Sequence, residues 1–342
     1  MIRFYLCGVT KRYSPVAIWL LIGVAMIMIQ VLLGGITRLT GSGLSITEWK
    51  PLLGAIPPMN EQDWNKAFDQ YKQIGQYKHI NFDFTLSDFK FIYFWEWFHR
   101  VWARLMGVVF AIGFVYFVAR KMFSRDMIWP MVLLFVLGGL QGAIGWIMVK
   151  SGLNDNDISV SHIRLSIHFM AALGLLCYVF WFAISFLVPK EQYIDNSALK
   201  KFSWFIIGVL VVQLFYGAFM AGLKAGTAAP TWPTINGMWV PENMGNITDH
   251  PITVQFIHRG IAYILAILVF AWWWKALRTP ATPLFRSTRI IPPVLVMLQV
   301  VLGIFTVVYS PDKQALLWLG VAHQFVAMLF LLSMVWTLRI MK

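Results

Sequence analysis

Charged residues and cysteines are both scarce in this 342-residue chain. Only 13% of the residues are charged, against about a quarter in soluble globular domains, and 59% are hydrophobic. This composition excludes an ordinary soluble protein. Cys7 and Cys177 are the two cysteines, and they lie before the first apolar run and in the middle of the fourth. We therefore expect no disulfide between them, and no metal-binding cysteine spacing occurs.

Acidic residues are also few, with 15 Asp and Glu against 28 Lys and Arg, which gives a formal net charge of +13. A basic chain could bind nucleic acid. Here, however, the cations lie in short loops between apolar runs, which is the orientation signal of a membrane protein. Membrane lipid is therefore an expected partner and nucleic acid is not.

Eight apolar runs are long enough to cross a hydrocarbon core about 30 Å thick. The sequence thus predicts an all-α polytopic membrane protein. The Lys and Arg counts of the loops place the N-terminus and the C-terminus in the cytoplasm, and the first run has no small-residue cleavage pattern, so we expect a retained helix. The spans cover roughly residues 16–36, 94–119, 127–149, 164–188, 202–223, 253–275, 290–309 and 315–338.

Two long segments, 37–93 and 224–252, separate these spans and are expected on the external side. Loops of such length usually have a function or fold over the domain. Within the first of them, residues 63–77 can form an amphipathic surface helix. We therefore expect the external loop 37–93 to cap the first part of the bundle.

A glutamine followed four residues later by a glycine recurs in the odd-numbered spans, and a histidine recurs near the outer start of the even-numbered spans. A single match of this kind could reflect helix packing only, but four at one depth are hard to obtain by chance. The spacing is 158 residues from Gln141 to Gln299, 159 from His99 to His258 and 155 from His168 to His323. This predicts two pseudo-symmetric four-helix bundles, 1–190 and 191–342, related by an axis along the membrane normal. The repeated residues are Gln30/Gly34, Gln141/Gly145, Gln213/Gly217 and Gln299/Gly303, with His99, His168, His258 and His323.

The paired histidines favour haem. Two imidazoles on facing helices can be the axial ligands of a haem iron, which predicts one pair of His99 and His168 and another of His258 and His323. Zinc usually needs a third or fourth protein ligand, which is missing here, so haem is the stronger candidate.

Arginines and glycines near the histidines also suit a haem. Arg100 and Arg259 follow His99 and His258 directly, and a guanidinium can bind a propionate carboxylate in bidentate fashion. Glycines on the neighbouring helices leave room for a flat macrocycle.

The two halves differ around their histidines. The first half has Glu96 and Arg164 where the second has Gln255 and Leu319. A site that handles protons needs an ionisable group, whereas an electron-transfer haem needs only two ligands and an apolar pocket. We therefore predict the reaction site in the first half and a fixed haem in the second. The alternative for Glu96 is a weak surface ion pair with Arg100, four residues away.

Several motifs resemble those of the haem A synthase family, in particular its subgroup from mitochondria and related bacteria, and the likeness covers nearly the whole chain. The Glu96-Trp97-Phe98-His99-Arg100 motif is accompanied by Pro230-Thr231-Trp232-Pro233, by His258-Arg259, and by a long run, Gly34-Gly35-Ile36-Thr37-Arg38-Leu39-Thr40-Gly41-Ser42-Gly43-Leu44-Ser45, followed by Glu48-Trp49.

The resemblance implies a haem-dependent oxidoreductase of the bacterial inner membrane. Such an enzyme oxidises the C8 methyl of haem O to a formyl group, through a geminal diol that loses water, and so makes haem A for cytochrome oxidase. The resemblance implies a b-type haem at His258 and His323, the substrate haem at His99 and His168, and Glu96 as the carboxylate needed for activity. Some relatives have a cysteine pair in external loops, which this chain lacks.

Two other functions fit the same residues. One is a two-haem b-type membrane cytochrome that transfers electrons from quinol, and the other is a non-enzymatic haem carrier. The difference between Glu96 and Gln255 favours the enzyme, because a protein that only transfers electrons does not need a carboxylate in one of its halves. Haem O and haem A are the expected ligands. Candidate partners are haem O synthase, cytochrome oxidase assembly factors and further copies of the same chain.

Overall fold

The computed structural model describes residues 14–48 and 53–342, and within these ranges the chain forms helices and no extended strand. Cys7 and Trp49 lie outside the described residues. Short 3-10 helices occur at η3 (Leu53–Ala55), η4 (Lys190–Gln192) and η5 (Ala225–Ala228). The α-helices are α1 (Ser14–Leu39), α2 (Glu61–Tyr71), α3 (Gly75–His79), α4 (Leu86–Ala119), α5 (Arg125–Lys150), α6 (His162–Leu187), α7 (Ser197–Gly222), α8 (Pro251–Leu277), α9 (Pro283–Thr288), α10 (Ile291–Val308) and α11 (Lys313–Arg339).

Eight helical segments of the described residues are long and apolar enough to cross a membrane, with α9 and α10 counted as one. This confirms the predicted all-α polytopic membrane protein. The largest difference from the sequence-based boundaries is at α4, which begins at Leu86 rather than near 94. Hydropathy misses this start because Asp88 and Lys90 interrupt the apolar run. Thr85 and Asp88 form a capping box that begins the helix.

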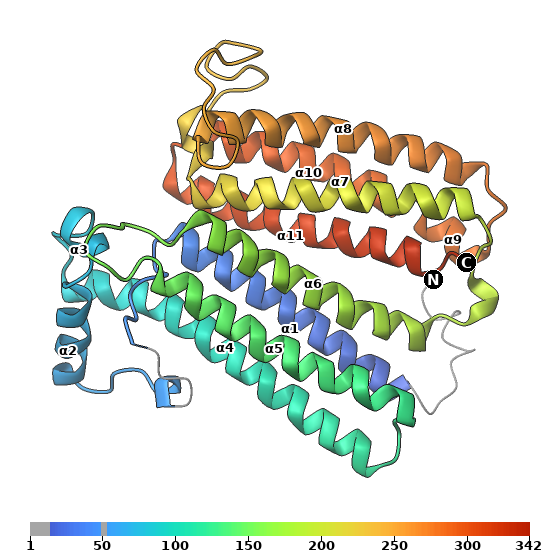
Figure 1. Ribbon diagram of the computed structural model, residues 1–342, viewed down its shortest axis with the longest axis horizontal. Helices are drawn as coiled ribbons and strands as arrows, with labels where there is room; N and C mark the ends of the chain where they lie inside the picture. Colours follow the sequence, from blue (N-terminus) through green and yellow to red (C-terminus); the bar gives the residue numbers. More distant parts are fainter. Residues whose placement is uncertain (1–13, 49–52) are drawn as a thin grey trace.

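The long helices gather in two groups. Figure 1 shows α1, α4, α5 and α6 lying together, and α7, α8, α10 and α11 lying beside them. Helices α1 and α6 of the first group pack against α11 of the second, and α6 also packs against α7. We call this boundary the seam. The C-terminal half of α11, from Val326 to Leu338, is mostly buried there. Consequently, residues of the two groups can share one cavity.

One end of the bundle has the long connections and the other has the C-terminus. Figure 1 shows α2, α3 and the segment between η5 and α8 at the first of these, which we call the loop end. With 34 residues, α4 is about 51 Å long, well beyond a hydrocarbon core of about 30 Å. Its first turns therefore project at the loop end, where α2 packs against them.

The segment before α4 is a packed unit. A cluster of buried apolar side chains joins it to the start of α4, and these are Leu44, Phe68, Tyr71, Ile74, Phe89 and Ile92. Burial raises the pKa of Tyr71 to about 12. Its hydroxyl therefore stays protonated and donates a hydrogen bond to Gln76. The predicted surface helix at 63–77 is two helices, α2 and α3, with a break at residues 72–74.

Glycine is required at Gly75, where this unit contacts the connection between α5 and α6. The amide of Gly75 donates to the carbonyl of Asn154 at 2.7 Å. A Cβ atom there would lie 2.6 Å from the carbonyl oxygen of Asp155, which is too close for any side chain. The loop unit is thereby held against the connection between α5 and α6.

Candidate functional site

The same glutamine–histidine contact occurs at four places. The side-chain nitrogen of Gln30 on α1 lies 2.9 Å from Nε2 of His99 on α4. The other contacts join Gln141 to Nδ1 of His168 at 3.2 Å, Gln213 to Nε2 of His258 at 3.4 Å, and Gln299 to Nε2 of His323 at 3.1 Å. Each glutamine thus meets the histidine of the next long helix.

The glycine of each Gln-xxx-Gly unit packs against the same imidazole. A Cβ added at Gly145 would lie 2.8 Å from Cε1 of His168, and one at Gly303 would lie 3.1 Å from Cε1 of His323. The corresponding distances are 3.3 Å from Gly34 to His99 and 3.4 Å from Gly217 to His258. Since real Cβ atoms do not approach within 3.0 Å, Gly145 has the least room for a side chain.

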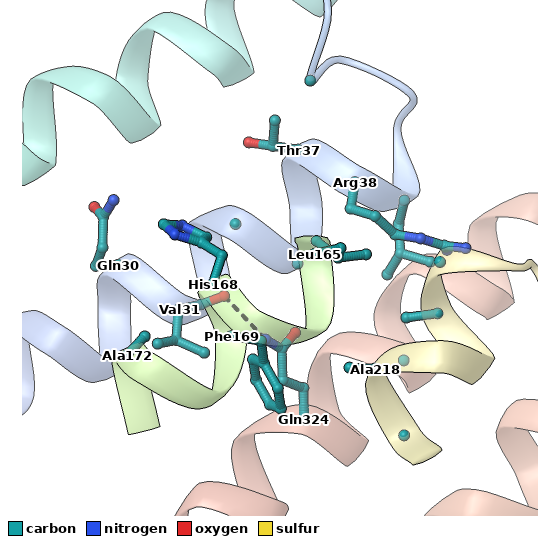
Figure 2. A pocket seen from close by; sticks show the side chains of 18 of the residues that line it. Gln30, Val31, Thr37, Arg38, Leu165, His168, Phe169, Ala172, Ala218 and Gln324 are labelled. Carbon is teal, nitrogen blue, oxygen red and sulfur yellow. Dashed lines mark hydrogen bonds between the residues drawn. The ribbon is translucent and has the colours of Figure 1, made fainter. Parts of the chain in front are cut away.

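The four histidines line one cavity of about 1830 Å³. This volume is roughly twice the upper end for an ordinary small-molecule pocket. His99 and His168 lie close enough to interact electrostatically, and so do His258 and His323. In Figure 2, Gln30 and His168 point into the same part of the cavity. The site therefore has two histidine pairs, one in each group of helices.

Glu96 is buried and fully engaged in hydrogen bonds. One carboxylate oxygen accepts from the Ser45 hydroxyl at 2.7 Å and from the amide of Ile46 at 2.9 Å, and the other pairs with Arg100 at 2.5 Å. The Glu96 side chain is only 3% exposed. The ion pair considered from the sequence is therefore present, but it is buried, and it fastens the segment after α1 to α4.

Arg100 completes this attachment. Its guanidinium also donates to the carbonyls of Ile46 and Glu48. The second group of helices has an equivalent arrangement, in which Arg259 donates to the carbonyls of Ala229, Thr231 and Thr234 at 2.8 to 3.3 Å. Arg100 uses two N–H groups on loop carbonyls and a third on Glu96, whereas Arg259 uses three on loop carbonyls. Each guanidinium has five such donors.

Gln255 occupies the place in α8 that Glu96 has in α4. Its side-chain amide donates to the carbonyl of Ala229 at 3.1 Å, and its buried Oε1 has no hydrogen-bond partner. Arg164 is not brought to the cavity. Its side chain is exposed and donates to the carbonyl of Ile147, so it joins α6 to α5.

Two cavity residues were not identified from the sequence as site residues. Gln324, next to His323, donates to the carbonyl of Val31 on α1 at 3.0 Å, across the seam, as Figure 2 shows. Arg38, near the end of α1, has a buried Nη2 without a hydrogen-bond partner. A charge so close to an apolar span is costly and usually functional, and this signal could have identified Arg38.

These residues fit two haem groups. Nδ1 of His258 and Nδ1 of His323 are buried without hydrogen-bond partners. Each of these imidazoles therefore keeps one ring nitrogen that no protein group occupies. The glycines leave the histidine faces uncovered, and the cavity is large. Among residues 14–48 and 53–342, no three His, Cys, Asp or Glu side chains gather in a way that could hold a metal ion directly. A porphyrin that brings its own four nitrogen ligands suits paired histidines better.

We expect Gly145→Ala to disturb the first histidine pair strongly. The added methyl would lie 2.8 Å from the His168 ring, so the imidazole must move. Productive geometry tolerates displacements of about 0.5 Å only. Haem affinity of this pair should fall about tenfold or more, as measured by haem titration monitored at the Soret band.

The matched control is Gly174→Ala on the same helix as His168, because no atom lies within 4 Å of a Cβ at Gly174. This variant should bind haem normally. Equal losses in both variants would contradict the proposed role of the Gly145 contact.

Comparison with known proteins places the chain in a family. The family model described as cytochrome oxidase assembly protein (COX15-CtaA) matches residues 17–335. The heme A synthase of Nitrosomonas eutropha is 38% identical over 341 residues, which cover 96% of this chain and 94% of that protein. The heme A synthase of Parvibaculum lavamentivorans is 41% identical over 326 residues, with 93% and 92% covered. That of Paracoccus denitrificans is 38% identical over 323 residues, with 91% and 84% covered. The chain therefore belongs to the haem A synthase family of cytochrome oxidase assembly proteins.

Proposed function

We propose that this protein is a haem A synthase, an enzyme that oxidises the C8 methyl of haem O to the formyl group of haem A. The observation that carries the proposal is the cavity with two histidine pairs, of which only one has a buried carboxylate beside it. Glu96 and Gln255 hold equivalent loops, yet only Glu96 can accept a proton as an anion. A cavity serving two identical electron-transfer haems would need no such difference.

The substrate haem O is assigned to the first pair, His99 and His168, and a b-type haem to the second, His258 and His323. A bound b-type haem would supply one-electron redox chemistry. In both pairs the imidazoles would hold a porphyrin by its iron. The glutamine amides beside them select the ring nitrogens that remain free, because a histidine tautomer follows from its hydrogen bonds.

Glu96 is assigned the proton transfers of the reaction. Two successive oxidations convert the methyl to a geminal diol, with the electrons passing to an external oxidant, and the diol then loses water to give the formyl group. The oxidations release protons near the substrate, and a fixed carboxylate can accept them. Its hydrogen bonds from Ser45, Ile46 and Arg100 hold the carboxylate in place. A charged group that is fixed in this way stabilises a transition state more in a site that excludes water than in bulk solvent.

The arginines have two assigned roles. Arg100 and Arg259 hold loops over the cavity through carbonyl contacts, and the N–H groups that these contacts leave over can bind propionate carboxylates. Arg164 acts only indirectly, by holding α6 to α5.

The membrane arrangement is part of the same proposal. Residues 1–190 and 191–342 form two halves of like orientation, related by an axis along the membrane normal, in a bacterial inner membrane. The larger Lys and Arg counts lie at the end with the C-terminus, which supports cytoplasmic termini. The loop end then faces outward. Haem O synthase, cytochrome oxidase assembly factors and a second copy of this chain are candidate partners.

Extraction of the haems tests the function. The protein purified from cells that contain haem O synthase should yield protohaem together with haem O or haem A, identified by chromatography and mass. Protohaem alone would favour the two-haem cytochrome. Tight binding of haem O without any conversion under turnover conditions would favour a haem carrier. Absence of haem would contradict all three functions.

A further inference from the structure

Three cations from different helices line the cavity at the loop end of the seam. Arg38 lies near the end of α1, Lys224 lies in the connection between α7 and η5, and Lys313 is the first residue of α11. We call them the seam cations. Arg38 belongs to the first group of helices and the two lysines to the second. The cavity therefore has cations contributed by both groups at its loop end.

No ion pair among the described residues involves a seam cation. Within residues 14–48 and 53–342, the ion pairs join Lys72 to Asp69, Lys78 to Asp155 and Arg100 to Glu96. Nη2 of Arg38 is buried and has no hydrogen-bond partner. A buried donor without a partner is costly, so the site is incomplete without an acceptor.

The seam cations also lie close to one another. Lys224 is exposed at the edge of the cavity, yet partial desolvation lowers its pKa, and the charges of Arg38 and Lys313 lower it further. Like charges that lie together destabilise a protein unless an anion separates them. The arrangement therefore favours an anionic ligand with more than one negative charge.

The side chain of Arg38 points toward the second group of helices. Figure 2 shows its guanidinium directed away from Gln30 and His168 and toward the ribbon that includes Ala218 of α7. His258, Arg259 and Tyr263 line the same cavity on that side. In contrast, Arg100 is fastened to Glu96 and to the segment after α1. The cations that have no protein partner are thus on the side of the His258 and His323 pair.

We propose that Arg38, Lys224 and Lys313, together with the N–H groups that Arg259 leaves over, bind the propionate carboxylates of the haem held between His258 and His323. This inference rests on the proposed function, because it takes the haem at that pair as given. A porphyrin with two propionates has two negative charges, which suit three cations. Carboxylates can also accept from the unpartnered Nη2 of Arg38 in the charge-assisted manner that strengthens hydrogen bonds. A residue of the first half would then help to hold the haem of the second.

The test is the rate at which purified holoprotein loses protohaem to apomyoglobin. Arg38→Gln, Lys224→Gln and Lys313→Gln should each speed the loss about tenfold or less, as expected for one charge-assisted contact, with Arg38→Gln having the largest effect because it is the most buried. Arg38→Lys should restore part of the retention. Lys150→Gln is the control, because Lys150 is an exposed cation at the loop end outside the cavity lining.

A second ligand identifies the group that is bound. The dimethyl ester of protohaem has no propionate charge, so the wild-type protein should lose it quickly, and the three variants should lose it no faster than the wild type does. Variants that speed the loss of ester and of protohaem by the same factor would overturn the proposal. A tenfold effect that appears only when phosphatidylglycerol is present would assign the site to a lipid phosphate and overturn it as well.

Two further outcomes separate this inference from the proposed function. Normal retention of protohaem together with weaker binding of haem O would place Arg38 at the substrate site and would refute the assignment. A wild-type protein that holds protohaem, shows the predicted variant effects and makes no haem A would refute the proposed function and leave the assignment of the seam cations standing.

Discussion

Replacing Glu96 by glutamine should abolish haem A formation while the b-type haem signal of the second half persists. Loss of a general acid or base typically costs about 100-fold to 10,000-fold in rate. Glutamine is nearly the same size, and its carbonyl can still accept from Ser45 and Ile46. It is also the residue that α8 has at Gln255. The substitution therefore removes the charge and keeps most of the loop attachment.

The measurement is the haem A content of membranes from cells that supply haem O, together with the reduced-minus-oxidised spectrum of the purified variant. Ser45→Ala separates the two roles of Glu96, because it removes one hydrogen bond from the carboxylate and leaves the carboxylate itself. We expect this control to retain most activity. If Ser45→Ala is as inactive as Glu96→Gln, Glu96 acts by holding the loop rather than by moving protons.

The stability of the Glu96 variant should also be measured. Arg100 would lose its anionic partner and keep the carbonyls of Ile46 and Glu48. Hydrogen bonds to charged groups contribute about 1.5 to 3 kcal/mol, so moderate destabilisation is expected. Simultaneous loss of the b-type signal would mean that the variant fails to fold, and Glu96→Asp would then be the informative substitution.

His258→Ala should remove the b-type haem signal entirely. An axial imidazole is half of the iron ligation supplied by the protein. In this structure the ring of His258 meets Gln213 on one side and lines the cavity with a buried, unpartnered Nδ1. No other described histidine is paired with His323 in the same way. The reduced-minus-oxidised spectrum of the purified variant measures the effect, and the extracted protohaem should fall in parallel.

A second histidine of the same region provides the control. His250 caps the start of α8 through Thr253 and does not line the cavity. His250→Ala should cost about 0.5 to 2 kcal/mol of stability, as loss of a helix cap does, and should keep the haem spectrum. A b-type signal that survives in His258→Ala would show that the ligand assignment is wrong.

The sequence predicted the positions of the helices better than the contacts that hold the helices and loops to one another. The spans could be located because apolar length is a local property. The repeated Gln, Gly and His positions could be aligned because they recur in the same order in successive helix pairs. The start of α4 was misplaced, although Thr85 and Asp88 form a recognisable capping box. Hydropathy averages over a window and does not respond to a cap.

Around the site, the sequence identified the residues and the fold determined what they contact. Arg100 was expected near propionates, and its neighbours in the chain gave no reason to expect that it would hold Ile46 and Glu48, more than 50 positions away. Gln324 and Val31 are 293 positions apart and are nevertheless joined by a hydrogen bond. Contacts of this kind depend on how helices pack.

By itself, then, the sequence determined that this is a membrane protein of eight spans with four histidines at similar depths, because hydropathy and periodicity are properties of neighbouring residues. Only the tertiary structure decided that the histidines share one cavity, that Glu96 is buried beneath a loop, and that Arg38 reaches the seam. Burial and the partners of a charge are set by side chains from distant segments, and those segments come together only when the helices pack.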